Sequence, residues 1–143
     1  MSKELKGIGG WLLVLVILLI LGVLNDFSRV ISNFSESIIS STVYLILGVF
    51  GVIVLIFIFN KSQKAPMITL VYLWISFVIG AIMMLFTVFL FDLGLEGAPQ
   101  EYVGIAQNFL LVISALGIFL ELIITIIFTL YLIKSVRVKN TFS

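Results

Sequence analysis

The sequence contains no cysteine and no histidine, and charged residues make up only 10% of its 143 positions. Without cysteine there can be no disulfide, no thiolate metal site and no cysteine nucleophile. Without histidine there can be no serine–histidine triad, no histidine-ligated zinc and no histidine proton shuttle. A net charge of +1 is too small to indicate nucleic-acid binding. We therefore expect no catalytic residue, no metal ligand, no cofactor and no nucleic-acid partner.

What the chain has in abundance is apolar surface. Hydrophobic residues make up 62% of the sequence, against about 45–50% in ordinary soluble domains. A soluble core of this size cannot hide so much apolar surface, so the solvent must be lipid. The pattern predicts an all-α integral membrane bundle of four transmembrane helices, forming a single domain over residues 1–143. The predicted spans cover residues 8–24, 43–59, 67–91 and 108–133.

The segments between the spans differ in character. Residues 27–38 place apolar side chains at helical spacing, which predicts a short amphipathic helix that lies on the membrane surface or extends the first span. A polar loop with scattered apolar residues is the alternative. Residues 60–64 form a short polar turn, so the second and third spans should be an antiparallel hairpin. The glycine, proline and acid content of residues 92–107 predicts an outer loop, although a helix could already begin at Pro99.

The charges predict an orientation. Of the eight Lys and Arg residues, only Arg29 lies outside three clusters at 3–6, 61–64 and 134–139. The two opposite connections hold acids instead, namely Asp26, Glu36, Asp92, Glu96 and Glu101. By the positive-inside rule, both termini are expected in the cytoplasm, and residues 134–143 form a basic cytoplasmic tail.

Glu121 is placed where water should be absent, near the middle of the last span. A central acid costs about 2.5–3.5 kcal/mol on the insertion scale, and each Leu, Ile, Phe or Val returns about 0.3–0.6 kcal/mol. About 18 such residues in the span outweigh that cost, so insertion is not threatened. Glu121 is nevertheless expected to face protein or water rather than lipid.

Small and polar residues recur at helical spacing beside Glu121 and in the third span, and they predict a polar seam between the two helices. The seam comprises Tyr72, Ser76, Gly80, Ser114, Gly117 and Thr125. Ser76 and Gly80 are expected at the depth of Glu121, as are Gly22, Gly48 and Gly51 of the first two spans. Small residues at one depth would let the helices approach closely around the carboxyl group.

Glu121 has two interpretations. In the first, the seam is a packing feature, and a protonated Glu121 is hydrogen-bonded to Ser76, Tyr72 or a backbone carbonyl. In the second, Glu121 takes up and releases a proton or cation during transport, or binds a basic group of a partner helix. No Lys or Arg lies within any predicted span, so a salt bridge to Glu121 would have to be intermolecular.

Two terminal motifs carry a family resemblance. The run Gly7-Ile8-Gly9-Gly10-Trp11-Leu12 precedes the first span, and Lys134-Ser135-Val136-Arg137-Val138-Lys139-Asn140-Thr141-Phe142 follows the last. Together with the four-span layout, they resemble the YdgK-like family of small bacterial inner-membrane proteins, a domain of unknown function. The family tail usually reads Ser-Lys-Arg-Val-Lys, and Val136 departs from it. The resemblance implies a bacterial cytoplasmic membrane and no particular activity.

The same motifs have a physical interpretation. Gly9-Gly10 would let the chain bend sharply beside Trp11, which would anchor the first span at the headgroups. Lys134, Arg137 and Lys139 match the anionic lipid of the inner leaflet. These four side chains are therefore candidate inner-leaflet lipid contacts. The alternative is that they are topology signals alone.

The functional prediction follows from these limits. A compact bundle with little water-soluble mass must act through lipid, through another membrane protein or through further copies of itself. We expect an interaction, accessory or scaffold subunit rather than an enzyme, because an intramembrane aspartyl protease would need a second acid within the spans. The alternative is an oligomeric proton- or cation-coupled small-molecule transporter that uses Glu121.

Overall fold

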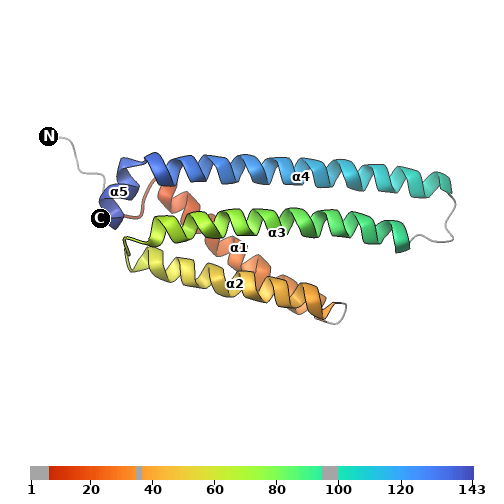
Figure 1. Cartoon of the computed structure of the whole chain (residues 1–143), viewed down its shortest axis with the longest axis horizontal. Coiled ribbons are helices and arrows are strands. Elements are labelled where there is room, and N and C mark those ends of the chain that lie inside the picture. Colours follow the sequence, from red (N-terminus) through yellow and green to blue (C-terminus); the bar gives the residue numbers. More distant parts are fainter. Residues whose placement is uncertain (1–6, 35–36, 95–99) are drawn as a thin grey trace. The chain divides into compact units, whose positions relative to one another are not determined.

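The structure, a computed structural model, describes residues 7–34, 37–94 and 100–143, with side chains omitted for 90–94 and 100–103. The described residues form helices and no strand (Figure 1). The helices are α1 (Trp11–Asn33), α2 (Ile38–Phe59), α3 (Ala65–Gly94), α4 (Gln100–Lys134) and α5 (Val136–Phe142). The first four are each long and apolar enough to cross a membrane, so the chain is an all-α, multi-pass membrane protein as predicted.

The helices extend further than the predicted spans. α1 continues without a break to Asn33, so the first part of segment 27–38 extends the first span and is not a separate helix. Ser37 then caps α2 by accepting a hydrogen bond from the Ser40 backbone N–H at 3.3 Å. The predicted loop over 92–107 is shorter than expected, because α3 continues to Gly94. α4 begins at Gln100, which confirms the alternative that a helix already begins near Pro99. The acidic residues in this segment therefore do not mark the helix ends.

Several predicted features fall outside the described residues. They are the basic residues Lys3 and Lys6 and the acidic residues Glu36 and Glu96. The chain also divides into two compact units, one formed by residues 1–72 with 128–143 and the other by residues 73–127. The prediction of a single domain over the whole chain stays a prediction.

In the first unit, α1 packs against α2 and buries one stripe of apolar side chains. The buried residues of α1 recur at helical spacing, which places them on one face. They are Leu12, Leu15, Val16, Leu19 and Val23. Intervening residues such as Leu13, Ile17 and Leu21 are exposed. Apolar side chains on both faces are what a lipid-surrounded helix requires.

Two glycines of α2 allow close contact between helices of this unit. A Cβ at Gly51 would press on Val23 of α1 and lie 2.9 Å from the Tyr72 Oη of α3. A Cβ at Gly48 would lie 3.3 Å from the Phe27 ring. Helices thus approach closely at Gly48 and Gly51, but the neighbours are on α1 and α3; that these glycines lie at the depth of Glu121 stays a prediction. Among the described residues, a Cβ at Gly22 would meet nothing within 4 Å, so no close approach occurs there.

The end of α1 and the start of α2 are joined by Arg29, the one basic side chain of these two helices. Arg29 Nη1 donates a hydrogen bond to Tyr44 Oη at 2.9 Å, and the guanidinium lies 5.2 Å from the centroid of the Tyr44 ring. Ser41 Oγ also donates to the Val30 carbonyl at 3.4 Å. Arg29 therefore joins α1 to α2. This role explains why a basic residue occurs near a connection whose other charged residues are acidic.

Candidate functional site

Glu121 lies against Gly80 in the second unit. Each oxygen of the Glu121 carboxyl group is 3.3 Å from the point that a Cβ at Gly80 would occupy. One turn along, Met84 of α3 faces Gly117 of α4, with its Sδ 3.4 Å from the corresponding point at Gly117. From Gly80 to Met84 is four residues forward along α3, and from Glu121 to Gly117 is four residues backward along α4. The two pairs define one antiparallel register and place Gly80 and Gly117 in a common seam with Glu121.

The periodicity of α4 explains why Glu121 faces this seam. Gly117, Glu121 and Thr125 are four residues apart and therefore share a face of the helix. Thr125 is buried and Glu121 is half-buried. The register sets Ser76 of α3 at the level of Thr125, one turn from the carboxyl group. A carboxyl group is thus held between two helices, beside the space that Gly80 leaves by having no side chain.

The structure excludes one of the hydrogen bonds considered for Glu121. The Ser76 Oγ is buried and has no hydrogen-bond partner, so of the three alternatives the bond from Ser76 is not formed. Tyr72 belongs to the first unit, where its ring packs edge-on against Phe50 with centroids 5.4 Å apart. Ser114 is half-buried on α4, two turns before Glu121. Within the described ranges, no cluster of three His, Cys, Asp or Glu side chains could hold a metal ion.

A second group of candidate residues lies on α5, which was predicted only as a basic tail. α4 ends at Lys134, and Ser135 caps α5 by accepting a hydrogen bond from the Val138 backbone N–H at 3.4 Å. Val138 and Phe142 are four residues apart on one face of α5, and both are buried. This apolar i, i+4 pair after a capping serine is the sequence signal that would have found the helix.

The two ends of the chain meet at α5. The Gly7 N–H donates a hydrogen bond to Thr141 Oγ1 at 3.0 Å, and the Thr141 hydroxyl donates to the Arg137 carbonyl at 2.7 Å. The Arg137 guanidinium lies against Gly9, with Nη1 2.5 Å from the point that a Cβ would occupy. We call these interactions of residues 7–10 with α5 the terminal contact. The two motifs that prompted the family resemblance thus form one structural element.

Gly10 makes the bend that begins α1. Its backbone has φ 56° and ψ −136°, a conformation that side-chain-bearing residues rarely adopt. The predicted sharp bend beside Trp11 is therefore confirmed. The sequence did not show why a glycine occurs at position 9. The reason is the guanidinium of Arg137, which occupies the space where a side chain would begin.

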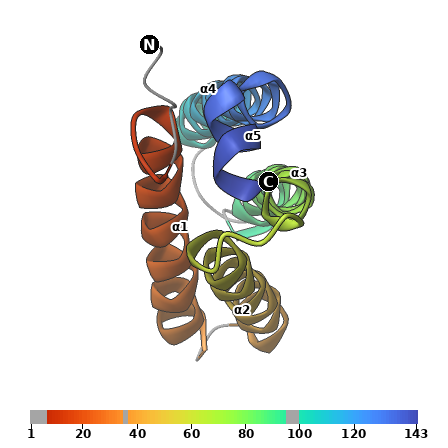
Figure 2. The ribbon, with the colours of Figure 1, turned by 90° about the vertical axis from the view of Figure 1, so that its left-hand side faces the viewer.

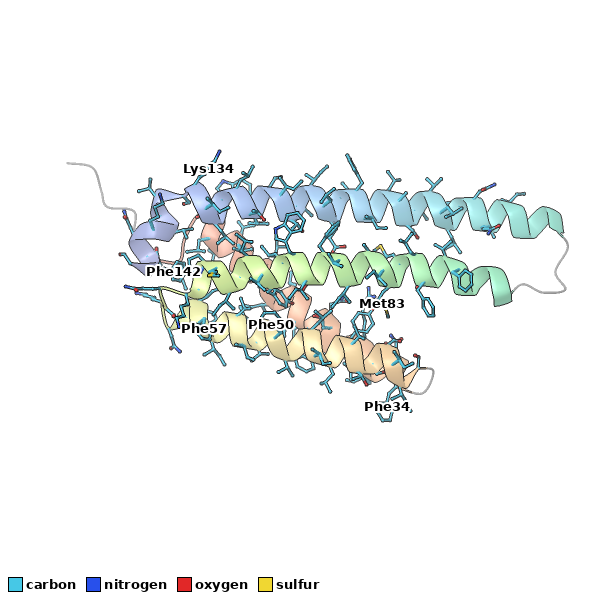
Figure 3. The ribbon with its side chains drawn as sticks, viewed as in Figure 1. Phe34, Phe50, Phe57, Met83, Lys134 and Phe142 are labelled. Carbon is cyan, nitrogen blue, oxygen red and sulfur yellow. The ribbon has the colours of Figure 1, made fainter. Side chains whose placement is uncertain are left out.

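Basic side chains gather at this end of the first unit. The α2–α3 turn with Lys61 and Lys64 lies at the same end as α5 (Figures 1 and 2). Figure 3 shows Phe57 and Phe142 at this end and Phe34 at the other. Lys134 and Lys139 are exposed, and Arg137 is half-buried. That these side chains and Trp11 contact lipid stays a prediction.

Comparison of the chain with protein-family models, with curated proteins and with solved structures finds no match. The resemblance to the YdgK-like family is therefore neither confirmed nor contradicted. A function has to be inferred from the geometry of the helices, from the seam that holds Glu121 and from the basic end that the terminal contact closes.

Proposed function

We propose that this multi-pass membrane protein is an accessory or scaffold subunit that binds another membrane protein through the first turns of α4. We place it in a bacterial cytoplasmic membrane with both termini in the cytosol. The terminal contact and the α2–α3 turn support this orientation, because they lie at one end of the first unit together with five basic residues. The positive-inside rule assigns such an end to the cytosol. The bacterial assignment rests on the family resemblance.

The length of the apolar surface on α4 carries the partner proposal. Ile105, near the start of α4, and Ile133, near its end, are both exposed. At about 1.5 Å per residue they are about 42 Å apart, against a hydrocarbon layer of about 30 Å. Fitting that length into the layer would need a tilt of about 45°, beyond the usual range of about 0–40°. α2 spans only about 33 Å and fits with little tilt.

The excess apolar surface therefore lies at the start of α4. Lys134 follows Ile133 directly and holds that end of the helix at the headgroups. At the average tilt of about 20°, the layer takes up only about 32 Å of helix. Ile105 and Phe109, about 42 Å and about 36 Å from Ile133, then lie beyond the hydrocarbon on the opposite side. Burying a side chain of this size is worth about 1.5–3 kcal/mol. A partner surface recovers that free energy, whereas water does not. Because the surface is continuous with the lipid-facing side of α4, the partner is a membrane protein.

Photo-crosslinking tests this proposal. A benzoylphenylalanine at Phe109 should give a discrete protein adduct in native membranes, and Phe109→Gln should reduce co-purification of that protein about tenfold or more. Phe59 is the matched control, because it is also a phenylalanine at a helix end and is 56% exposed, against 65% for Phe109. The probe at Phe59 should give lipid adducts. Lipid adducts alone at Phe109, or the same protein adducts at both positions, would contradict a partner surface on α4.

The second candidate is an oligomeric proton- or cation-coupled transporter. It is favoured by one observation, the half-buried Glu121 carboxyl group beside the space at Gly80. In liposomes containing the purified protein and a pH-sensitive dye, this candidate predicts gradient-driven flux that Glu121→Gln abolishes. Asp26→Asn is the control, since Asp26 is a described acid on a different helix. Absence of flux, or equal flux in both variants, excludes transport through Glu121.

A further inference from the structure

We propose that the basic end of the first unit is a binding surface for anionic phospholipid headgroups, organised by the terminal contact. The surface consists of Lys134, Arg137 and Lys139 on α4 and α5, with Lys61 and Lys64 on the α2–α3 turn. It is independent of the partner surface on α4, since Ile105 and Phe109 take no part in it.

The first support is that α5 is a fixed helix. Burial of Val138 and Phe142 anchors one face of α5, so Lys139 and Arg137 project from a rigid element. Lys134 precedes α5 by two residues and projects from the end of α4 (Figure 3). A flexible basic tail would lose conformational entropy when it gathers its charges around a phosphate group. Here folding has already brought them together.

The second support is the position of Arg137. Its guanidinium lies against Gly9, and the Thr141 hydroxyl bonds to its backbone carbonyl. The guanidinium is planar and carries five N–H donors, an arrangement that suits bidentate contact with phosphate oxygens. Only glycine at position 9 allows it to lie there. The terminal contact thus orients one phosphate-binding group among four lysines.

The third support is the charge balance. Among the described side chains the carboxylates are Asp26 and Glu121, and neither lies on α5 or the α2–α3 turn. The five basic side chains thus have no described carboxylate side chain on their own elements. Such cations are attracted to anionic headgroups, and the attraction increases with each Lys or Arg near the surface.

Apolar neighbours indicate a lipid rather than a free anion. Trp11 and Val136 are each 63% exposed, and Ile133 next to Lys134 is exposed as well. A surface that alternates cations with exposed apolar side chains matches a phospholipid, whose phosphate lies beside acyl chains. Tryptophan is also enriched at headgroup depth. A soluble phosphate would gain nothing from these apolar neighbours.

Trp11 provides the measurement. The chain has two tryptophans, so Trp74→Phe leaves Trp11 as the only reporter at this end. The protein in neutral detergent is titrated with phosphatidylglycerol carrying brominated acyl chains, or with the equivalent brominated phosphatidylcholine. Phosphatidylglycerol should quench Trp11 fluorescence at a concentration about tenfold lower. The preference should persist in about 50 mM inorganic phosphate, added in place of chloride at equal ionic strength so that electrostatic screening is unchanged.

Four variants separate an organised surface from net charge. Lys134→Gln with Lys139→Gln removes two charges from the surface and should lower the apparent affinity about tenfold. Arg29→Gln removes one charge at the other end of α1 and should leave it unchanged. Arg137→Lys keeps the charge but loses the planar group, and it should lower the affinity about threefold. Gly9→Leu should do the same by displacing the guanidinium. Circular dichroism checks that each variant is folded. If Gly9→Leu does not fold, Arg137→Lys alone tests the role of the guanidinium.

The proposal is overturned if both lipids quench Trp11 equally. It is also overturned if inorganic phosphate removes the preference, which would indicate a free-anion site. If Arg29→Gln weakens binding as much as the double lysine variant, net charge alone explains the attraction. If the lysine variants matter but Arg137→Lys does not, the terminal contact does not organise the surface. If phosphatidylglycerol does not bind at all, the proposal is overturned and an acidic protein segment becomes the better-suited occupant.

Discussion

Gly51→Leu should separate the helices of the first unit and lower its free energy of unfolding by about 3 kcal/mol or more, at or beyond the usual range for overpacking. A Cβ at Gly51 would press on Val23 and lie 2.9 Å from Tyr72 Oη. Neither neighbour can yield easily. Val23 is buried and β-branched, which limits its side-chain rotation, and the Tyr72 ring is held edge-on by Phe50. The larger leucine side chain therefore has to displace a helix.

The measurement is unfolding by SDS titration in mild detergent, followed by far-UV circular dichroism. Gly22→Leu provides the matched control, because Gly22 is also in a long apolar helix and a Cβ there would meet nothing within 4 Å. That variant should be as stable as the parent or slightly more stable, since glycine is a poor helix former by about 0.5–1 kcal/mol. Equal losses in both variants would show that α1, α2 and α3 do not meet at Gly51.

Phe142→Ala should release α5 and open the terminal contact. Phe142 is only 5% exposed, and truncating a buried phenylalanine typically costs about 3–5 kcal/mol. A seven-residue helix cannot compensate for that loss, because isolated helices shorter than about 12–15 residues are marginal in water. Once α5 leaves its position, the Thr141 hydroxyl can no longer accept from the Gly7 N–H.

Limited trypsin digestion measures the release, because Arg137 and Lys139 provide cleavage sites within α5. The Phe142→Ala variant should be cut there at least about tenfold faster than the parent, since a released helix spends most of its time open. Val136→Ala is the control on the same helix, where the truncated side chain is exposed. If the two variants are cleaved at the same rate, Phe142 does not anchor α5.

The spans were predictable because lipid limits the possible structures. A chain that crosses hydrocarbon must satisfy its backbone hydrogen bonds internally, so a long apolar run is a helix almost regardless of its detail. The helix ends were harder. Residues 92–94 read as a loop from their polar content, yet α3 continues through them, and for residues 100–107 the sequence left both loop and helix open. Polar composition alone therefore does not mark the end of a helix.

The candidate site was predictable where periodicity alone decides it. Helical spacing puts Gly117, Glu121 and Thr125 on one face, and Gly80 does lie against the carboxyl group of Glu121. Contacts that depend on tertiary packing were not predictable. The hydroxyl of Ser76 makes no hydrogen bond, and Gly22 packs against nothing. A glycine in a sequence shows where close approach is possible but does not show which neighbour uses the space.

The terminal contact was missed for a related reason. Each motif has a sufficient local explanation, a bend for Gly9-Gly10 and a topology signal for the basic residues. Nothing in either motif indicates the other. Their pairing becomes visible only when folding brings together residues separated by 134 positions. A seven-residue helix such as α5 likewise depends on the surface that receives Val138 and Phe142.

This separation also sets an order of assembly during synthesis. The hydrogen-bond partner of Gly7 is synthesised 134 residues later in the chain. At a translation rate of about 5–20 residues per second, that delay is about 7–27 s. During this time all four apolar helices have to leave the ribosome and enter the bilayer, while the glycine turn ahead of α1 has no α5 to hold it. α1 is therefore fastened at its start by α5, which emerges only after α2, α3 and α4.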